Sequence, residues 1–323
     1  MNNIINKDKK RIKKTISVVT PCYNEEGNIY DVYHAIKKIR EAHPRYEWEH
    51  IFIDNSSVDK SLKLLKEIAH KDKNVKIIVN IRNFGDIKSS VYGYLAAKGD
   101  AVIPFFCDLQ DPPDLINDFI SKWEEGYDAV VGVKTSSKEN SLIFFLRKIF
   151  YNIIESISET DHIKNFNGFG LFDKSFWNIV RNLNEPHPYF RGMVAEFAPN
   201  RIEIEYIQEK RRKGKSKNNL YRLYDSAMLA FVSHSKVPLR LATFIGFLVS
   251  FFSIIVAIFY FFYKIILWNS FEMGIPPLII GIFFFGAVQL IFLGIIGEYV
   301  GTILTEIKNR PLVIEKERIN FDK

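Results

Sequence analysis

Two long stretches without a charged residue lie in the last third of the chain, at residues 241–263 and 275–297. Each is about 23 residues long, which is enough for a helix to cross a hydrocarbon layer of about 30 Å. Two helices buried in a soluble core are the alternative, since such helices are also apolar on all sides. The length favours a transmembrane hairpin over residues 239–300 and leaves the preceding residues to fold in water.

Basic residues flank this hairpin on both sides. Lys236 and Arg240 precede the first stretch, and Lys308 and Arg310 follow the second. The short connecting segment 268–274 holds Glu272 and no basic residue. Because basic residues concentrate on the cytosolic side of membrane helices, we expect both ends of the hairpin, and both chain termini, on that side.

Short apolar runs rich in β-branched residues recur up to about residue 134. They lie at residues 16–19, 51–53, 75–79, 101–105 and 129–131. Each run is typical of a buried strand, and amphipathic helical patterns lie between them. The alternation predicts an α/β domain with a mostly parallel sheet and helices on both faces. Ligands of such sheets bind beyond the carboxyl ends of the strands, so the polar residues after each run should converge on one cleft.

The net charge of +7 comes from two compact basic clusters, at residues 7–14 and 210–217. Compact clusters suit anionic headgroups or a phosphate-bearing substrate better than a nucleic-acid duplex, and no nucleic-acid-binding motif accompanies them. The first cluster forms a basic N-terminal tail, residues 1–14. Cys22 and Cys107 are too few for a disulfide scaffold, which favours a reducing cytosol.

Two amphipathic patterns lie outside the expected strands. Residues 141–157 carry an apolar helical stripe, and its periodicity favours a core helix over one on a bilayer. Residues 219–238 predict an interfacial helix that leads into the hairpin.

Four polar motifs follow the expected strands. They are Val-Thr-Pro-Cys-Tyr-Asn-Glu-Glu at residues 19–26, Asp-Asn-Ser-Ser-Val-Asp at 54–59, Arg-Asn-Phe-Gly at 82–85 and Asp-Leu-Gln-Asp-Pro-Pro at 108–113. In this order they resemble family 2 glycosyltransferases of the GT-A fold. With the basic segment and the two apolar stretches, the chain is similar to the polyprenyl-phosphate branch, which includes dolichyl-phosphate mannose synthases and bacterial undecaprenyl-phosphate glucosyltransferases. The resemblance covers about residues 15–310.

The resemblance implies a domain order and an activity. A Rossmann-like GT-A catalytic domain is expected at 15–218, followed by the amphipathic helix at 219–238, the hairpin at 239–300 and a cytosolic C-terminal tail at 301–323. The implied enzyme moves a sugar from a nucleotide-sugar, expected to be UDP-linked, to a polyprenyl (undecaprenyl) phosphate at the cytosolic face of the bacterial inner membrane. The expected partners are these two substrates and the bilayer, with no nucleic acid. Assembly as a homo-oligomer stays open.

The resemblance also assigns residues to the donor. Those expected to bind the nucleotide-sugar are Pro21, Tyr23, Asn24, Glu25, Asp54, Arg82 and Asp108. Asp54 ends a strand, where it can accept hydrogen bonds from the base or ribose. A turn role is the alternative for Asn55 and the two serines after it. Arg82 is either a phosphate contact or a surface charge.

A divalent cation is expected beside Asp108. The departure of a nucleotide diphosphate concentrates negative charge, and Mg²⁺ or Mn²⁺ can neutralise it when held by one or two carboxylates and the phosphates. Asp108 is the expected ligand, and Gln110 offers a second oxygen. The alternative is that Asp108 and Asp111 only cap a helix that begins at Pro112.

The basic segment 210–217 is expected to hold a phosphate. By resemblance Arg211, Arg212, Ser216 and Lys217 bind the lipid phosphate or the donor diphosphate, whereas plain attraction to lipid headgroups is the alternative. Arg211 and Lys217 join Asp108 as the expected catalytic residues. A phosphate monoester has a second pKa of about 6 and is already anionic near neutral pH, so no general base is required. Catalysis then requires that the two phosphates be positioned and that their charges be screened. A single displacement inverts the anomeric centre.

The chain departs from the family pattern at several positions. Phe106 stands where an acidic residue is usual, and Asn55 stands where a second Asp is common. Gly168 and Gly170 stand where an Asp and an Arg are frequent. These departures keep open a second hypothesis, a catalytically weak membrane-tethered paralogue or scaffold that binds nucleotide-sugars. A dehydrogenase is disfavoured because no G-x-G-x-x-G follows the first strand.

Overall fold

The computed structural model describes residues 13–135, 163–183, 185–186, 188–209, 237–266, 275–308 and 310–321. These residues belong to two compact units, one built on a β-sheet and one containing two long helices. The amphipathic pattern at 141–157, the basic segment 210–217 and nearly all of the expected interfacial helix at 219–238 lie outside the described residues. Those assignments therefore stay predictions.

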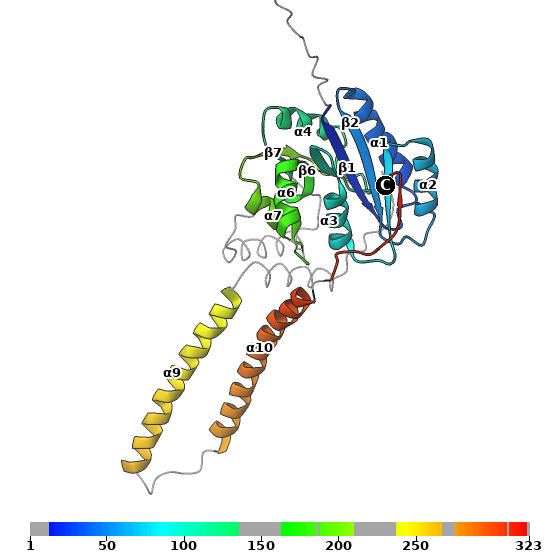
Figure 1. Ribbon diagram of the computed structural model, residues 1–323. Coiled ribbons are helices and arrows are strands. Elements are labelled where there is room, and N and C mark those ends of the chain that lie inside the picture. The colour runs from blue at the N-terminus through cyan, green and yellow to red at the C-terminus, as the bar shows by residue number, and fades with distance from the viewer. Residues whose placement is uncertain are drawn as a thin grey trace, which may run out of the picture. The chain divides into compact units, whose positions relative to one another are not determined.

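The first unit is built on an eight-stranded sheet (Figure 1). Its strands are β1 (Thr15–Cys22), β2 (Glu47–Asp54), β3 (Val75–Asn80), β4 (Ala101–Pro104), β5 (Ala129–Lys134), β6 (Phe166–Asp173), β7 (Arg201–Tyr206) and β8 (Glu315–Ile319). Their order is β7-β5-β6-β4-β1-β2-β3-β8. Strands β4, β1, β2 and β3 are parallel, whereas β6 runs antiparallel between β4 and β5. The prediction of a mostly parallel sheet is thus confirmed.

The reversal of β6 decides which residues share an edge of the sheet. Strand β7 is parallel to β5, and both are antiparallel to β6. The amino end of β6 therefore lies at the same edge as the carboxyl ends of β1 to β5 and of β7. Strand β8 is antiparallel to β3 and also begins at this edge. We call it the carboxyl edge.

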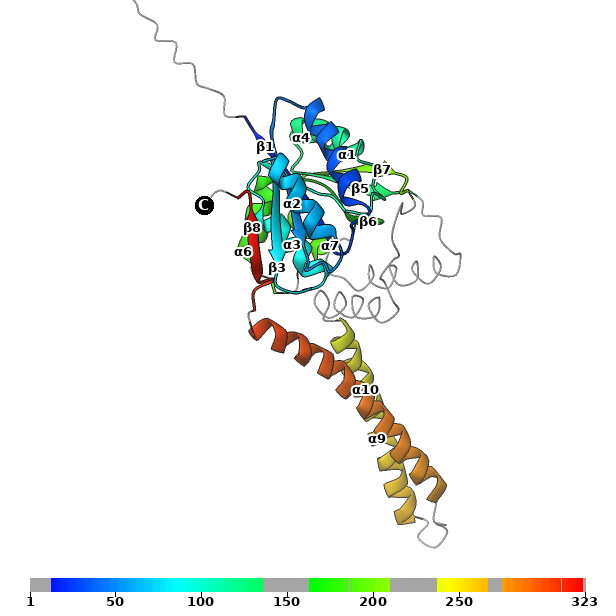
Figure 2. The same cartoon turned by 90° about the vertical axis from the view of Figure 1, so that its right-hand side faces the viewer.

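Helices cover both faces of the sheet (Figures 1 and 2). Helices α1 (Ile29–Ala42), α2 (Ser61–Lys71) and α4 (Leu115–Glu124) pack on one face, and α3 (Asp86–Ala96), α6 (Lys174–Leu183) and α7 (Phe190–Phe197) pack on the other. Neighbouring strand residues such as Val18 and Val19 belong to opposite core clusters. The near-continuous apolar runs follow from this, because side chains alternate between two buried faces.

The last strand comes from the residues expected to form a C-terminal tail. Strand β8 pairs with β3 and closes that edge of the sheet (Figure 2). The sheet therefore contains strands from before and after the two long helices. A membrane cannot pass between paired strands, so both ends of the helical pair must lie on the same side of any membrane that the helices cross. This conclusion agrees with the distribution of basic residues.

The second unit contains helices α9 (Val237–Ile266) and α10 (Ile275–Ile307). Within them Leu239–Tyr263 and Gly281–Leu304 are long and apolar enough to cross a membrane, and none of the apolar window in either helix is buried. Side chains such as Phe247 and Phe283 are 70% and 75% exposed. The buried-core alternative for these helices therefore does not hold among the described residues. The second span lies closer to the C-terminus than the charge-free stretch predicted.

Candidate functional site

The loops after β1 and β2 are joined at the carboxyl edge. The Asn24 amide donates to Ser57 Oγ at 3.0 Å, and the Val58 amide donates to Asn24 Oδ1 at 2.8 Å. The Glu25 amide donates to Ser61 Oγ at 2.9 Å. Asn24 adopts a left-handed backbone with φ 55°, which Asn tolerates better than most residues. The structure thus brings the first two predicted nucleotide-binding motifs together.

Asp54 ends β2 beneath these loops. The register pairs it with Cys22 at the end of β1, and it likewise pairs Pro21 with Ile53. Asp54 is fully buried, and burial raises the pKa of its carboxyl group. Its Oδ2 accepts the Ser57 amide at 3.2 Å, so the carboxylate shapes its own loop. Its predicted contact with a base or ribose stays a prediction, as do those of Pro21 and Tyr23.

The loop after β3 is tied to β2 by Asn55, whose side chain is buried. Asn55 Nδ2 donates to Gly85 O at 2.9 Å and to Asn83 Oδ1 at 3.1 Å. Asn55 Oδ1 accepts the Phe84 amide at 2.9 Å and Asn80 Nδ2 at 3.1 Å. Asn55 thus uses both a donor and an acceptor, a combination that an ionised Asp lacks. The departure from the family pattern at this position has a structural reason.

Arg82 lies on that loop and is exposed. Its guanidinium lies 4.2 Å from the centre of the Phe84 ring, and it donates to Asn83 O at 3.2 Å. Burial and the nearby Arg82 charge lower the pKa of Lys88 in α3. Arg82 precedes α3 and Lys88 lies in its first turn, so two cationic residues are present near the start of this helix, which suits an anionic group.

The loop after β4 makes a sharp turn beside Asp108. Leu109 is buried yet has a left-handed backbone with φ 53°, a conformation that strains a residue with a Cβ atom. The Gln110 amide donates to Asp108 Oδ1 at 3.3 Å. Helix α4 begins at Leu115, later than the predicted start at Pro112, and its N-cap residue Asp114 makes no side-chain capping bond.

Asp111 is not a helix cap. It is 2% exposed and accepts hydrogen bonds from the Tyr206 hydroxyl, from Asn167 Nδ2 at 3.1 Å and from Gln208 Nε2 at 3.3 Å. Burial raises the pKa of the Asp111 carboxyl group and of the Tyr206 hydroxyl. These bonds fix the β4 loop to β6, to the end of β7 and to the residues that follow β7. The sequence analysis did not identify Tyr206 or Gln208 as site residues.

The residues after β7 continue from this network towards the basic segment. The Glu209 amide donates to Gln110 O at 2.9 Å, and Gln110 Nε2 donates to Glu209 O at 3.4 Å. Arg211, Arg212, Ser216 and Lys217 lie outside the described residues. In the sequence they begin two residues after Glu209. The chain thus enters the basic segment from a point held beside the Asp108 loop.

Asp108 and Gln110 fit a cation that arrives with phosphates. Among the described residues no three His, Cys, Asp or Glu side chains gather in a group that could hold a metal ion. Mg²⁺ is commonly held by one or two carboxylates with substrate phosphates completing its shell. The carboxylate of Asp108 and the amide oxygen of Gln110 belong to this kind of donor set, and the carboxylate is only partly buried.

Two departures from the family pattern face each other. A Cβ atom at Gly168 would lie 3.6 Å from the rings of Phe106 and Phe190. Gly168 has φ 109°, which favours glycine. The acidic residue and the Asp that the family often has at these positions are thus replaced by an apolar pairing of Phe106 with the Gly168 backbone.

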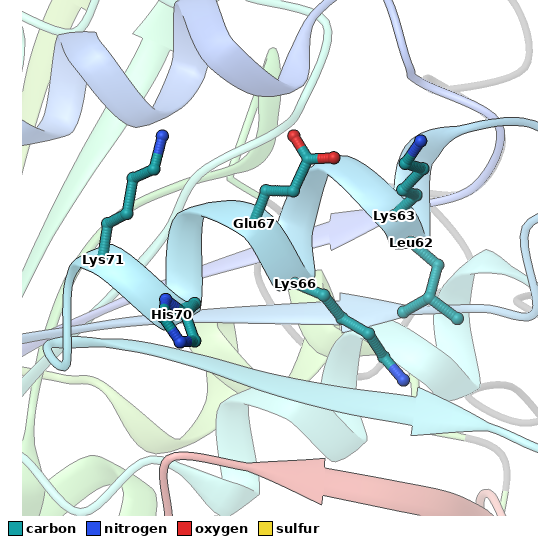
Figure 3. A pocket seen from close by; sticks show the side chains of 6 residues that line it. All are labelled: Leu62, Lys63, Lys66, Glu67, His70 and Lys71. Atoms are coloured by element: carbon teal, nitrogen blue, oxygen red, sulfur yellow. The ribbon is translucent and has the colours of Figure 1, made fainter.

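A surface hollow lies along helix α2 (Figure 3). Its lining side chains all come from α2 and are Leu62, Lys63, Lys66, Glu67, His70 and Lys71. None of them belongs to the predicted site, and the hollow brings no second element of the chain to a ligand.

Several known proteins similar to this chain are glycosyltransferases. Residues 17–185 match the model of glycosyl transferase family 2. The chain is 33% identical to the uncharacterised glycosyltransferase YkcC of Bacillus subtilis, over 95% of this chain and 94% of that protein. It is 33% identical to the SfII prophage-derived bactoprenol glucosyl transferase of Shigella flexneri, over 94% and 97%.

Two sugar-3-phosphoglycerate synthases are among the solved structures to which the chain is similar. Mannosyl-3-phosphoglycerate synthase of Rubrobacter xylanophilus is 14% identical, with a TM-score of 0.48 over 67% of this chain and 71% of that one. Glucosyl-3-phosphoglycerate synthase of Mycobacterium tuberculosis, solved with Mn²⁺, UDP and phosphoglyceric acid, is 17% identical, with a TM-score of 0.44 over 68% and 76%.

The relatives match across the sheet unit and the helical unit alike, and the family model covers β2 to β6 and most of β1. The chain belongs to glycosyl transferase family 2.

Proposed function

We propose that this glycosyltransferase moves a sugar from a nucleotide-sugar, UDP-linked, to a polyprenyl phosphate at the cytosolic face of a bacterial inner membrane. The observation that carries the proposal is the pair of hydrogen bonds between Gln110 and Glu209. They join the loop of the expected cation ligand to the start of the basic segment. The bactoprenol glucosyl transferases to which the chain is similar support a polyprenyl acceptor.

The donor would lie along the carboxyl edge. Asn24, Glu25 and Asp54 belong to loops that hydrogen bonds already hold together, so the nucleotide meets a preformed surface. Asp108, with Gln110, would hold a Mg²⁺ or Mn²⁺ ion, which when bound neutralises charge on the departing diphosphate. Arg82 supplies a second positive charge at the same edge.

The acceptor would be held by the basic segment. Arg211, Arg212, Ser216 and Lys217 offer the bidentate and point-charge contacts that suit a phosphate monoester. A phosphate oxygen attacks the anomeric carbon, the bond to the diphosphate breaks, and one displacement inverts the configuration. Since that oxygen is already anionic near neutral pH, the residues position and screen two phosphates and need not remove a proton.

The helical pair supports a membrane acceptor. Helices α9 and α10 are apolar and unburied, and the sheet returns after them through β8. A hairpin with both ends on one side keeps the carboxyl edge on the side from which a cytosolic nucleotide-sugar arrives.

The test is direct transfer of label. Full-length protein in detergent is given undecaprenyl phosphate, Mg²⁺ or Mn²⁺ and a panel of nucleotide-sugars labelled in the sugar. We expect one label to enter the organic phase, with equimolar release of nucleoside diphosphate and with loss of transfer when EDTA is added. A scaffold that only binds nucleotide-sugars would bind UDP but release no diphosphate and leave the organic phase unlabelled.

A further inference from the structure

The loop of residues 81–85, which carries Arg82, has a second support besides Asn55. The Ile81 amide donates to Ile314 O at 3.0 Å, immediately before β8 begins. The pairing of β8 with β3 reaches Asn80 opposite Glu315, with a register shift between Val79 and Asn80. The C-terminal strand thus holds the loop at the residue that precedes Arg82.

The same end of β8 also holds the helix that follows the loop. The Tyr92 hydroxyl, on α3, donates to Glu315 Oε1 at 2.7 Å. Arg318 donates to both oxygens of Glu315 at 2.7 Å and fixes the carboxylate in place. Ile81 at the start of the loop and Tyr92 behind it are therefore bound to neighbouring residues of one strand. The strand is thus bonded both to the start of the loop and to the helix that follows it.

The far end of β8 has a different attachment. Asn320 Nδ2 donates to Ala69 O at 2.7 Å and to Val75 O at 2.8 Å. Glu315 and Asn320 are five residues apart, which corresponds to about 17 Å along a strand. The two ends can therefore be weakened separately, one beside the Arg82 loop and one away from it.

Arg82 depends on this loop for its position. Its own contacts, to Asn83 O and the Phe84 ring, lie within the loop and move with it. A side chain held only by its own loop binds an anion more weakly when that loop is loose, because binding must then order the loop as well.

We propose that β8 positions Arg82 for the donor phosphates: the C-terminal strand, through Ile314 and Glu315, holds the loop of residues 81–85 in its binding conformation. The inference rests on the proposed function, since it assigns Arg82 to the donor. It gives the strand that follows the apolar helices a role in nucleotide binding beyond closing the sheet.

The test compares the two ends of β8 in full-length protein in detergent. The near-end variants are Tyr92→Phe and Glu315→Gln, and the matched far-end control is Asn320→Ala. Four quantities are measured: hydrogen exchange of residues 81–85, the Kd for UDP and for GDP with Mn²⁺, kcat at saturating donor, and Tm. Arg82→Ala is added alone and combined with Tyr92→Phe.

We expect the near-end variants to speed exchange in the loop and to weaken binding of the nucleotide that the wild type prefers by about tenfold, or about 1.4 kcal/mol. Their kcat should stay near the wild-type value. Asn320→Ala should lower Tm by a similar amount and leave Kd unchanged. In the Arg82→Ala background, Tyr92→Phe should weaken binding no further, because the two changes act through one group.

Two results would overturn the inference. Near-end variants that bind nucleotide as well as the wild type would separate β8 from the donor site. If Asn320→Ala lowered Tm as much as the near-end variants and also weakened nucleotide binding as much, the effect of β8 would be general stabilisation of the fold. Failure of the proposed function looks different. A wild type that binds UDP or GDP but transfers no sugar would refute the transfer and leave this inference standing, whereas a wild type that binds neither nucleotide would overturn both.

Discussion

Restoring the family's usual residue at position 55 should damage this protein. Asn55→Asp keeps the shape of the side chain and its Oδ1 acceptor, but it removes the Nδ2 donor to Gly85 O and Asn83 Oδ1. The new carboxylate would be 5% exposed and would face two oxygen atoms. The new carboxylate oxygen, Gly85 O and Asn83 Oδ1 would then be three hydrogen-bond acceptors with no donor hydrogen between them.

The cost follows from these contacts. Two lost hydrogen bonds account for about 2 kcal/mol, and burying an unpaired acceptor beside others adds about 1–3 kcal/mol. The total of about 3–5 kcal/mol is a large part of a typical stability of about 5–15 kcal/mol. For a unit of this size it corresponds to a fall in Tm of about 6–20 °C. Protonation of the new carboxyl group restores one hydrogen-bond donor, so the loss of stability should be smaller at low pH.

The assay is thermal unfolding of full-length protein in detergent from about pH 4, near the ordinary pKa of an Asp carboxyl group, to about pH 8. The control is Asn178→Asp, an exposed position whose oxygen accepts Arg181 Nη1 at 3.1 Å and which tolerates a carboxylate. The control should stay within about 0.5 kcal/mol of the wild type. An Asn55→Asp protein as stable as the wild type at pH 8 would refute the bonding assigned to Asn55.

Three further changes test other parts of the site. Burial raises the folded pKa of Asp111, so the contribution of this carboxyl group to stability is present below about pH 4 and is lost as pH rises through the folded pKa. Asp111→Asn should remove this pH-dependent decline in Tm. A Tm profile parallel to that of the wild type would contradict this. Gly168→Ala should cost about 1–3 kcal/mol in chemical denaturation because φ is 109°, and an unchanged midpoint would argue against that backbone. Asp108→Ala should abolish label transfer while membrane extraction and Tm stay close to those of the wild type, and retained transfer would remove Asp108 from catalysis.

The central strands could be predicted because their apolar runs reflect burial on two faces. The alternation of Ile202, Ile204 and Tyr206 likewise indicates β7. Strand β8 could not be found this way, since its sequence Glu-Lys-Glu-Arg-Ile has no strand-like pattern. Its conformation comes from pairing with β3, a tertiary contact that overrides local preference.

The location of the site could be predicted from the sequence, but its hydrogen-bond network could not. Because parallel strands end at one edge, the motifs after β1 to β4 were expected to converge. Hydrogen bonds join the loops after β1, β2 and β3, whereas the β4 loop is bonded to β6 and to the residues around the end of β7. The bond between Tyr206 and Asp111 joins residues 95 positions apart, and only the order β7-β5-β6-β4 brings them together. The pattern of apolar runs does not indicate that β6 is antiparallel, so the hydrogen-bond partners of Asp111 could not be predicted.

The most direct measurement asks whether the cation at Asp108 and the acceptor phosphate share one site. The ³¹P signal of a short-chain polyprenyl phosphate, bound to full-length protein in detergent, is recorded as Mn²⁺ and UDP are added. The account predicts that Mn²⁺ with UDP broadens this signal strongly in the wild type. In Asp108→Ala the acceptor should still bind, but the broadening should be lost. Equal broadening in both proteins, or none in the wild type, would contradict the account.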